Sequence, residues 1–138
     1  MKIFFDGGSR PNPGRMESAV VARGQLFYRD DQGEGSSHQA EWEALLHALD
    51  VGAQLKAREI LLLGDNKAVI DQAKGQMSDQ SASGETAQRY HQALLPFAKV
   101  RLRYVKRTQN LAGIALGHRR NGSIGQRLVA ARGQGLSA

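Results

Sequence analysis

The sequence predicts an α/β domain, because short apolar segments typical of strands alternate with segments of helical periodicity. Residues 58–64 contain a continuous apolar run of the kind that forms a buried strand. A helix is expected directly after it, over 66–74, since the apolar spacing changes there to that of a helix. A longer helix is expected over 39–56, where Trp42 begins a series of apolar side chains at helical spacing.

The remaining elements complete this alternation in chain order. A first strand over 2–6 ends at Asp6, and the Gly, Pro and Asn residues of 7–14 predict a turn rather than a strand or a helix. Residues 17–24 and 25–30 are expected to pair as a β-hairpin. The later elements are a helix over 84–95, a strand over 99–106 and a helix from about residue 110.

Length and composition predict one domain in a reducing compartment. The chain has 138 residues, and we expect a single domain over 1–132 followed by a flexible tail over 133–138. The absence of cysteine excludes disulfides and zinc–thiolate sites. The apolar run at the amino terminus is too short for a signal peptide, which favours the cytoplasm, a soluble monomer and no membrane partner.

Charge is unevenly distributed along the chain. Residues 1–85 hold all 13 acidic residues and 9 of the 19 Lys and Arg residues, whereas residues 86–138 hold the other 10 basic residues and no acid. A basic half beside an acidic cluster suits a polyanion that is held by its phosphates. Arg-rich surfaces also occur in basic proteins that bind nothing specific, so the charge pattern alone leaves both readings open.

Three acidic residues occupy positions where a metal site would form. Asp6 and Asp65 each follow an apolar strand, and Glu41 lies near the start of the long helix. Each alone has an ordinary structural explanation as a turn, cap or first-turn acid. Together they indicate a binding site, because ligands of open α/β sheets bind at the carboxyl ends of strands.

The chain resembles the ribonuclease H family. The resemblance rests on four segments in the family's order and spacing, covering residues 1 to about 118. These are Asp6-Gly7-Gly8-Ser9-Arg10-Pro11-Asn12-Pro13-Gly14, Ala40-Glu41-Trp42-Glu43-Ala44-Leu45, Gly64-Asp65-Asn66 and Val105-Lys106-Arg107-Thr108-Gln109-Asn110. It implies a ribonuclease H-like fold, with a mixed five-stranded sheet flanked by helices on both faces.

The resemblance also implies an activity: hydrolysis of the RNA strand of an RNA/DNA hybrid with two divalent cations, Mg²⁺ or Mn²⁺. By position in the motifs, Asp6 would bridge both ions, and Glu41 and Asp65 would complete the ion on the leaving-group side. Glu43 should not face the same ions, since it lies about 200° further round the helix than Glu41.

The fourth acid of the family is missing. Its place falls at Ile114 if Asn110 is matched, or at Gly113 or Ala115 if the register shifts by one, and no acid follows Glu85. The resemblance then implies weakened or Mn²⁺-preferring catalysis. One hypothesis is that His118 or Asn110 fills the vacant place, since both share a helix face with Ile114. Alternatively, His118 is a cation at a helix end.

Several residues are expected to contact nucleic acid by their match to the family's positions. Asn12 matches the loop that reads ribose hydroxyls, whereas Ser37 and His38 stand where the family commonly has two asparagines, and Lys67 replaces a frequent glutamine. The full set is Gly7, Ser9, Arg10, Asn12, Ser37, His38, Asn66, Lys67 and Arg107. Wider grip is expected from Arg101, Arg103, Lys106, Arg107, Arg119 and Arg120.

Three functions remain open from the sequence. The first is a metal-dependent ribonuclease H. The second is a catalytically silent relative that binds RNA/DNA hybrid or double-stranded RNA. The third is another nuclease on the same kind of fold, against which the loop from Asp6 to Gly14 argues, since Asn12 and the glycines suit ribose contact.

Overall fold

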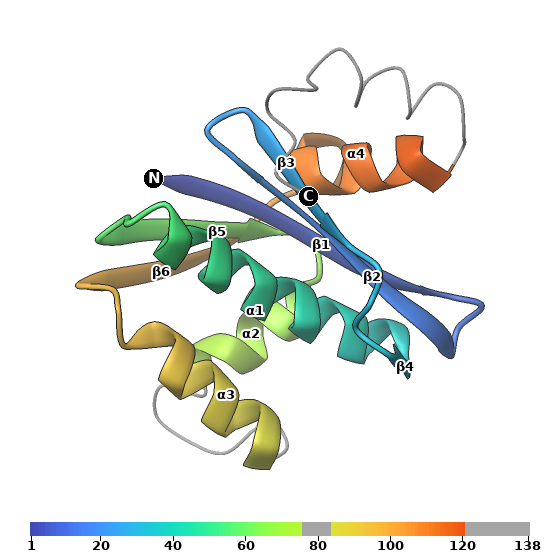
Figure 1. Cartoon of the computed structure of the whole chain (residues 1–138), viewed down its shortest axis with the longest axis horizontal. Coiled ribbons are helices and arrows are strands. Elements are labelled where there is room, and N and C mark those ends of the chain that lie inside the picture. Colours follow the sequence, from blue (N-terminus) through green and yellow to red (C-terminus); the bar gives the residue numbers. More distant parts are fainter. Residues whose placement is uncertain (76–83, 121–138) are drawn as a thin grey trace.

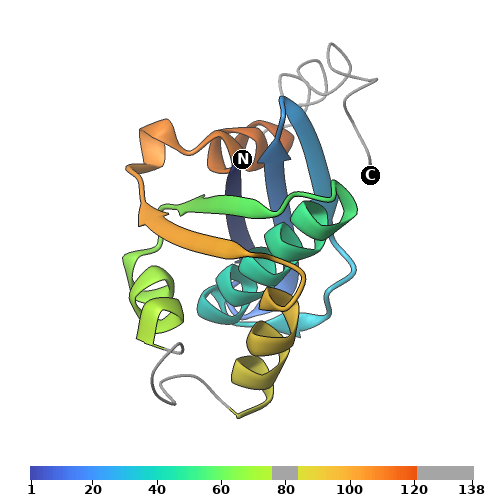
Figure 2. The same cartoon turned by 90° about the vertical axis from the view of Figure 1, so that its left-hand side faces the viewer.

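The computed structural model describes residues 1–75 and 84–120, which form a mixed sheet with helices on both faces (Figures 1 and 2). The strands are β1 (Lys2–Arg10), β2 (Gly14–Ala22), β3 (Gln25–Arg29), β4 (Glu34–Gly35), β5 (Glu59–Gly64) and β6 (Lys99–Tyr104). The helices are α1 (Ser37–Gln54), α2 (Lys67–Gly75), α3 (Gly84–Leu94) and α4 (Leu111–Arg120), with a 3-10 turn η1 at Arg107–Gln109. The predicted fold class is confirmed. The expected tail lies outside the described residues.

The sheet brings the first strand next to the strand that follows the long helix. Its order is β3-β2-β1-β5-β6, with the short β4 added beside β2. β1, β2 and β3 are antiparallel neighbours, whereas β1, β5 and β6 run parallel to one another. The two-residue β4 is a sixth strand that the prediction of five strands lacked. The parallel β1–β5 pair is what places Asp6 and Asp65 at the same edge.

Two apolar cores lie on the two faces of the sheet. One face packs against α1, α2 and α3, where Trp42 and Tyr90 make an edge-to-face contact with ring centroids 5.7 Å apart. The other face packs against α4 through a smaller cluster that includes Leu116 and Val21. Alternation along the strands decides which side chain enters which core, since successive residues point to opposite faces. No helix among the described residues is long and apolar enough to cross a membrane.

The expected turn over residues 7–14 is wrong. β1 continues to Arg10, and Gly7, Gly8 and Ser9 pair with the beginning of β2, so that only residues 11–13 turn. Local sequence favours a turn there, but the antiparallel partner strand supplies hydrogen bonds that local composition does not reveal. The hairpin predicted for residues 17–24 and 25–30 is confirmed, since β2 and β3 are antiparallel neighbours. Arg23 and Gly24 between them both have positive φ, as a tight two-residue turn requires.

Helix α1 begins two residues earlier than its apolar pattern predicts. Ser36 caps it, with a side chain that accepts a hydrogen bond from the Gln39 N–H while the Gln39 side chain accepts one from the Ser36 N–H. Glu41 therefore lies in the second turn rather than the first. Its position reflects contact with β1 more than the helix dipole.

Candidate active site

Asp6 and Asp65 meet because their strands are parallel neighbours. Phe4 of β1 pairs with Leu63 of β5, and each acid lies two residues further along its strand direction. Both side chains therefore point to the same face of the sheet, at the edge where β5 ends. This is the edge at which open α/β sheets bind ligands.

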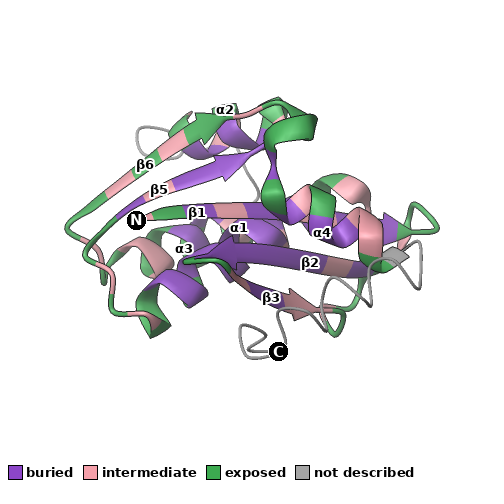
Figure 3. Ribbon diagram, turned by 90° about the horizontal axis from the view of Figure 1, so that it is seen from above, coloured by how far each residue is buried: buried purple, intermediate pink, exposed green. Residues whose placement is uncertain are grey.

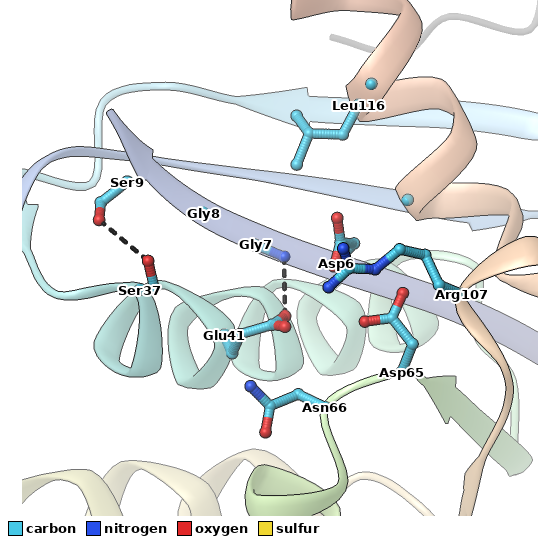
Figure 4. Close-up of a pocket in the computed structure, with 12 residues that line it drawn as sticks. Asp6, Gly7, Gly8, Ser9, Ser37, Glu41, Asp65, Asn66, Arg107 and Leu116 are labelled. Carbon is cyan, nitrogen blue, oxygen red and sulfur yellow. Dashed lines mark hydrogen bonds between the residues drawn. The ribbon is translucent and has the colours of Figure 1, made fainter. Parts of the chain in front are cut away.

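Glu41 reaches the same place from α1, because β1 lies unusually close to this helix at Gly7. A Cβ atom added at Gly7 would lie 2.2 Å from the carbonyl oxygen of Ala40, so only glycine permits the contact. The Gly7 N–H then donates a hydrogen bond of 2.9 Å to Glu41 Oε1 (Figure 4). A glycine that does no chemistry thus fixes the distance between an acid on a strand and an acid on a helix.

The three carboxylates form a tight group. One oxygen atom from each of Asp6, Glu41 and Asp65 lies within 4.8 Å of the others. Glu41 is only 7% exposed. Burial and, next, the negative charge of Asp6 raise the pKa of the Glu41 carboxyl to about 8, with a smaller contribution from Asp65, while the Gly7 N–H and the Asn66 side chain oppose the shift. In the absence of a cation the raised pKa favours the protonated form of Glu41. Carboxylate oxygens are the ligands that hard divalent cations prefer.

Two asparagines hold the acids in place. Asn110 is fully buried between η1 and α4, and its Nδ2 donates to Asp65 Oδ2 at 3.1 Å and to the Phe5 carbonyl oxygen at 3.0 Å. Its Oδ1 accepts from the Ala112 N–H at 3.1 Å and so caps α4. Asn66 accepts from the Val69 N–H at 3.0 Å at the start of α2, and its side chain lies beside Glu41 (Figure 4). Asn110 thus orients Asp65, and the start of α2 fixes the position of Asn66.

α4 presents Gly113 to the carboxylates, and Gly113 is one of the three positions expected for the family's fourth acid. A Cβ atom at Gly113 would lie 3.3 Å from Asp65 Oδ2 and 3.5 Å from Asp6 Oδ2. Ile114, by contrast, is 38% exposed and does not line the pocket beside the acids. His118 also lies outside both that pocket and the carboxylate group of the described residues. Asn110 is adjacent to the group, but both ends of its amide already have protein partners.

A pocket of about 410 Å³ opens beside the three acids. Figure 4 shows the Arg107 guanidinium extending over it from η1, on the side of Asp6 and Asp65. The other residues that line it are Gly7, Gly8, Ser9, Ser37, Asn66, Gly113, Leu116 and Gly117. The pocket therefore has three carboxylates on one side and the Arg107 guanidinium on another, and it is large enough for a phosphate group.

The expected nucleic-acid contacts fall into two groups. Gly7, Ser9, Ser37, Asn66 and Arg107 line the pocket, whereas the others do not. Asn12 joins the hairpin tip to α1, since its Oδ1 accepts from the Ser37 N–H at 3.0 Å and from Ser9 Oγ at 3.3 Å.

The remaining three expected contacts do not line the pocket. His38 bonds Gln72 at 2.8 Å, Lys67 lies 4.0 Å from Asp71, and Arg10 is exposed. Gly8, Leu116 and Gly117 also line the pocket without having been predicted, since they carry no chemical group that a sequence search would select.

The fold and this site define the class: a mixed α/β domain with a carboxylate cluster at the ends of parallel strands. Residues 19–119 match the family described as reverse transcriptase-like. A ribonuclease HI of Halobacterium salinarum is 35% identical over 81 residues, spanning 52% of this chain and 39% of that protein. The chain belongs to the ribonuclease H family.

Solved structures agree with this assignment. RNase H1 from the halophilic archaeon Halobacterium salinarum superposes with a TM-score of 0.72 at 26% identity, over 88% of this chain and 98% of that one. The N-terminal RNase H domain of rv2228c from Mycobacterium tuberculosis gives 0.63 at 24% identity, over 80% and 90%. LC11-RNase H1 in complex with an RNA/DNA hybrid gives 0.60 at 20% identity, over 80% and 88%. The last two likenesses concern the fold alone.

Proposed function

We propose that this chain is a metal-dependent ribonuclease H that hydrolyses the RNA strand of RNA/DNA hybrids. The observation that carries the proposal is the group of Asp6, Glu41 and Asp65, with oxygen atoms within 4.8 Å of one another beside a pocket with a cationic wall. The similarity to a ribonuclease HI supports the substrate class. We also propose a monomer in the cytoplasm, which the short chain and its lack of cysteine suit.

The proposed roles follow from the positions of the side chains. Asp6, Glu41 and Asp65 would hold two divalent cations, which when bound activate the attacking water and stabilise the leaving oxygen. Asn110, anchored on the Phe5 carbonyl oxygen, holds one oxygen of Asp65 by a hydrogen bond. The Gly7 N–H holds one oxygen of Glu41 in the same way. Such outer hydrogen bonds fix the orientation of metal ligands.

The rest of the pocket suits the substrate. Arg107 presents donors that match the geometry of a phosphate group. Ser9 and Ser37 approach each other to 3.5 Å at the opposite rim and offer hydroxyl groups to the ribose side of a strand. We assign hybrid discrimination to this rim and to Asn12, which fixes its shape.

The absence of an acid at Gly113 and Ile114 bears on metal preference. Magnesium demands near-ideal octahedral coordination by oxygen. Three carboxylates supply fewer of these oxygen ligands than four would. We therefore propose that Mn²⁺ supports more cleavage than Mg²⁺. The same absence favours the second candidate, a silent domain that binds hybrid or double-stranded RNA.

Cleavage of a hybrid with labelled RNA, in Mg²⁺ and separately in Mn²⁺, separates the two candidates. We expect cleavage of the RNA strand alone, and a loss on the order of 10³-fold or more in Asp6→Asn. Asp71→Asn is the matched control, because Asp71 is an exposed acid on α2 outside the cluster. DNA and RNA duplexes test the substrate class. Hybrid binding without cleavage in either metal would overturn the proposed activity and establish the silent domain.

A further inference from the structure

The outer face of β5 and β6 carries no α-helix in the described part of the chain, although Leu63 near the end of β5 is buried there. Among residues 1–75 and 84–120, α4 is the helix on this face of the sheet, and its apolar contacts are with β1, β2 and β3 (Figure 3). β5 and β6 lie beside α4 with no described helix over them (Figure 3). A solvated sheet face carries polar side chains, and the charged side chains on this face are mainly basic.

Three cations stand in a row on this face of β6. Lys99, Arg101 and Arg103 are exposed, while Val100 and Leu102 between them turn to the opposite core. Alternate residues of a strand lie about 7 Å apart, so the row spans about 13 Å. None of the three takes part in the ion pairs found among the described residues, which are Arg29–Asp50, Lys67–Asp71 and Arg89–Glu43.

The row ends in a shallow hollow. Leu61 of β5 pairs with both Lys2 of β1 and Arg101 of β6, so the two cations flank it. A hollow of about 230 Å³ lies there, lined by Lys2, Lys99 and Arg101 together with the one acid Glu59 and the apolar Met1, Ile60 and Leu61. The surface therefore combines a concave shape with a net positive charge.

The same face leads to the carboxylate cluster. By the strand register, Arg103 lies beside Leu63, one alternation before Asp65 on β5, and Arg107 follows four residues later in the pocket wall. Asp6, Asp65 and the β6 cations thus point to one side of one sheet. A strand held at the pocket would reach this face past η1, the 3-10 turn that carries Arg107.

We propose that the outer face of β5 and β6 binds the sugar–phosphate backbone of nucleic acid that extends from the site, with Arg103, Arg101 and Lys2 as successive phosphate contacts. The proposal rests on the proposed function for what occupies the pocket. Regularly spaced cations bind phosphate groups without reading base edges, so the binding has no sequence preference. Its affinity decreases as the salt concentration rises.

The test is the salt dependence of hybrid binding by Arg101→Gln/Arg103→Gln. Binding is measured in the Asp6→Asn background, so that no cleavage intervenes, with a short hybrid that ends at the pocket and one that extends past β6. For the long hybrid we expect the slope of log K against log salt to fall by about 2, roughly 1 for each lost phosphate contact. The short hybrid should show no difference.

The matched control is Arg23→Gln/Lys74→Gln, which removes two exposed cations from the β2–β3 turn and from α2. A long-hybrid slope equal to that of the control would overturn the proposed surface, even if the unsubstituted chain cleaves hybrids. Conversely, the unsubstituted chain could fail to cleave while the Arg101→Gln/Arg103→Gln variant shows the reduced salt slope for the long hybrid. That result would support the proposed binding surface and overturn the proposed activity.

Discussion

Helices α1 and α4 approach the same two aspartates from opposite faces of the sheet and bring different groups to them. α1 brings Glu41, nearly buried and hydrogen-bonded to the β1 backbone. α4 brings Gly113, at which even a Cβ atom would touch Asp65 Oδ2. The α1 side, which supplies a carboxylate, is thus the closed side of the site, and the α4 side, which supplies none, is its open side. A cation bound on the open side would need water or substrate oxygen to complete its coordination.

Glu41→Gln should break the closed side and have the largest effect. An amide keeps the shape and still accepts from the Gly7 N–H, but it removes an anionic ligand, which we expect to reduce cleavage on the order of 10³-fold. Glu43→Gln is the matched control, since Glu43 pairs with Arg89 away from the cluster. Initial rates on a labelled hybrid measure both. Equal rates in the two variants would remove Glu41 from the site.

Asn110→Ala tests whether the α4 side contributes through orientation. The change removes the donor to Asp65 and leaves the buried Phe5 carbonyl and the Ala112 N–H without their partner. We expect a 10- to 100-fold loss of activity, roughly the effect of removing a group that orients a metal ligand. The free energy of unfolding should fall by about 1–3 kcal/mol. Urea titration separates the loss of stability from a kcat effect in the molecules that remain folded.

Gly113→Asp should close the open side. The Cβ atom of an aspartate there would lie 3.3 Å from Asp65 Oδ2, so Asp65 must shift slightly to accept it. A fourth carboxylate should strengthen cation binding, and we expect Mg²⁺-supported cleavage to rise by roughly 10-fold, the lower end of the changes in metal affinity that substitutions around metal sites produce. Ile114→Asp adds the same charge one residue on, at an exposed position, and should not raise the rate. Gly117→Asp controls for charge at the pocket rim. A gain at Ile114 alone would show that α4 faces the site in a different register.

The raised pKa of Glu41 predicts how the metal-free protein responds to pH. Between pH 6.5 and 8 the folded chain holds a proton on Glu41 that the unfolded chain has released, so stability should fall as pH rises. The limit is about 1.4 kcal/mol for each pH unit. Burial lowers the pKa of His47 to about 3, which affects stability only below this window. Glu41→Gln should flatten the slope, and an unchanged slope by denaturant titration would contradict the assignment.

His118→Ala is expected to have the smallest effect. His118 lies outside the carboxylate group and the pocket lining among the described residues, so Mn²⁺-supported cleavage should change by less than about twofold. A larger loss confined to Mn²⁺ would restore the hypothesis that this imidazole completes the metal site.

Much of the fold follows from local sequence, but the meeting of its parts does not. The apolar run before Asp65 and the helical spacing after Trp42 locate β5 and α1 closely. The residues after Asp6 were assigned wrongly to a turn, because their pairing with β2 is a contact between distant segments. The convergence of Asp6 with Asp65 likewise depends on β1 and β5 being neighbours, which no local pattern specifies.

The open side of the site shows where counting along the sequence stops being enough. Spacing from Asn110 points to Ile114 only if Asn110 belongs to the helix. In the structure Asn110 precedes α4 as its cap, and Gly113 faces the acids instead. Each residue along a helix turns the side-chain direction by about 100°, so the residue at which α4 begins determines which side chain meets the carboxylates. The roles of His38, Lys67 and Arg10 in binding stay predictions.

The two hydrogen bonds that Asn110 donates also govern when this site can exist. One joins Asn110 to the Phe5 carbonyl oxygen, 105 residues earlier in the sequence, and the other joins Asn110 to Asp65. A chain still being synthesised can pair β1, β2 and β3 long before residue 110 has emerged. Contacts between such distant residues form late, because their closure costs the most entropy. The carboxylates therefore acquire their final geometry only after residue 110 has been added, and a chain that ends before it carries the acids without the arrangement that would let them act on nucleic acid.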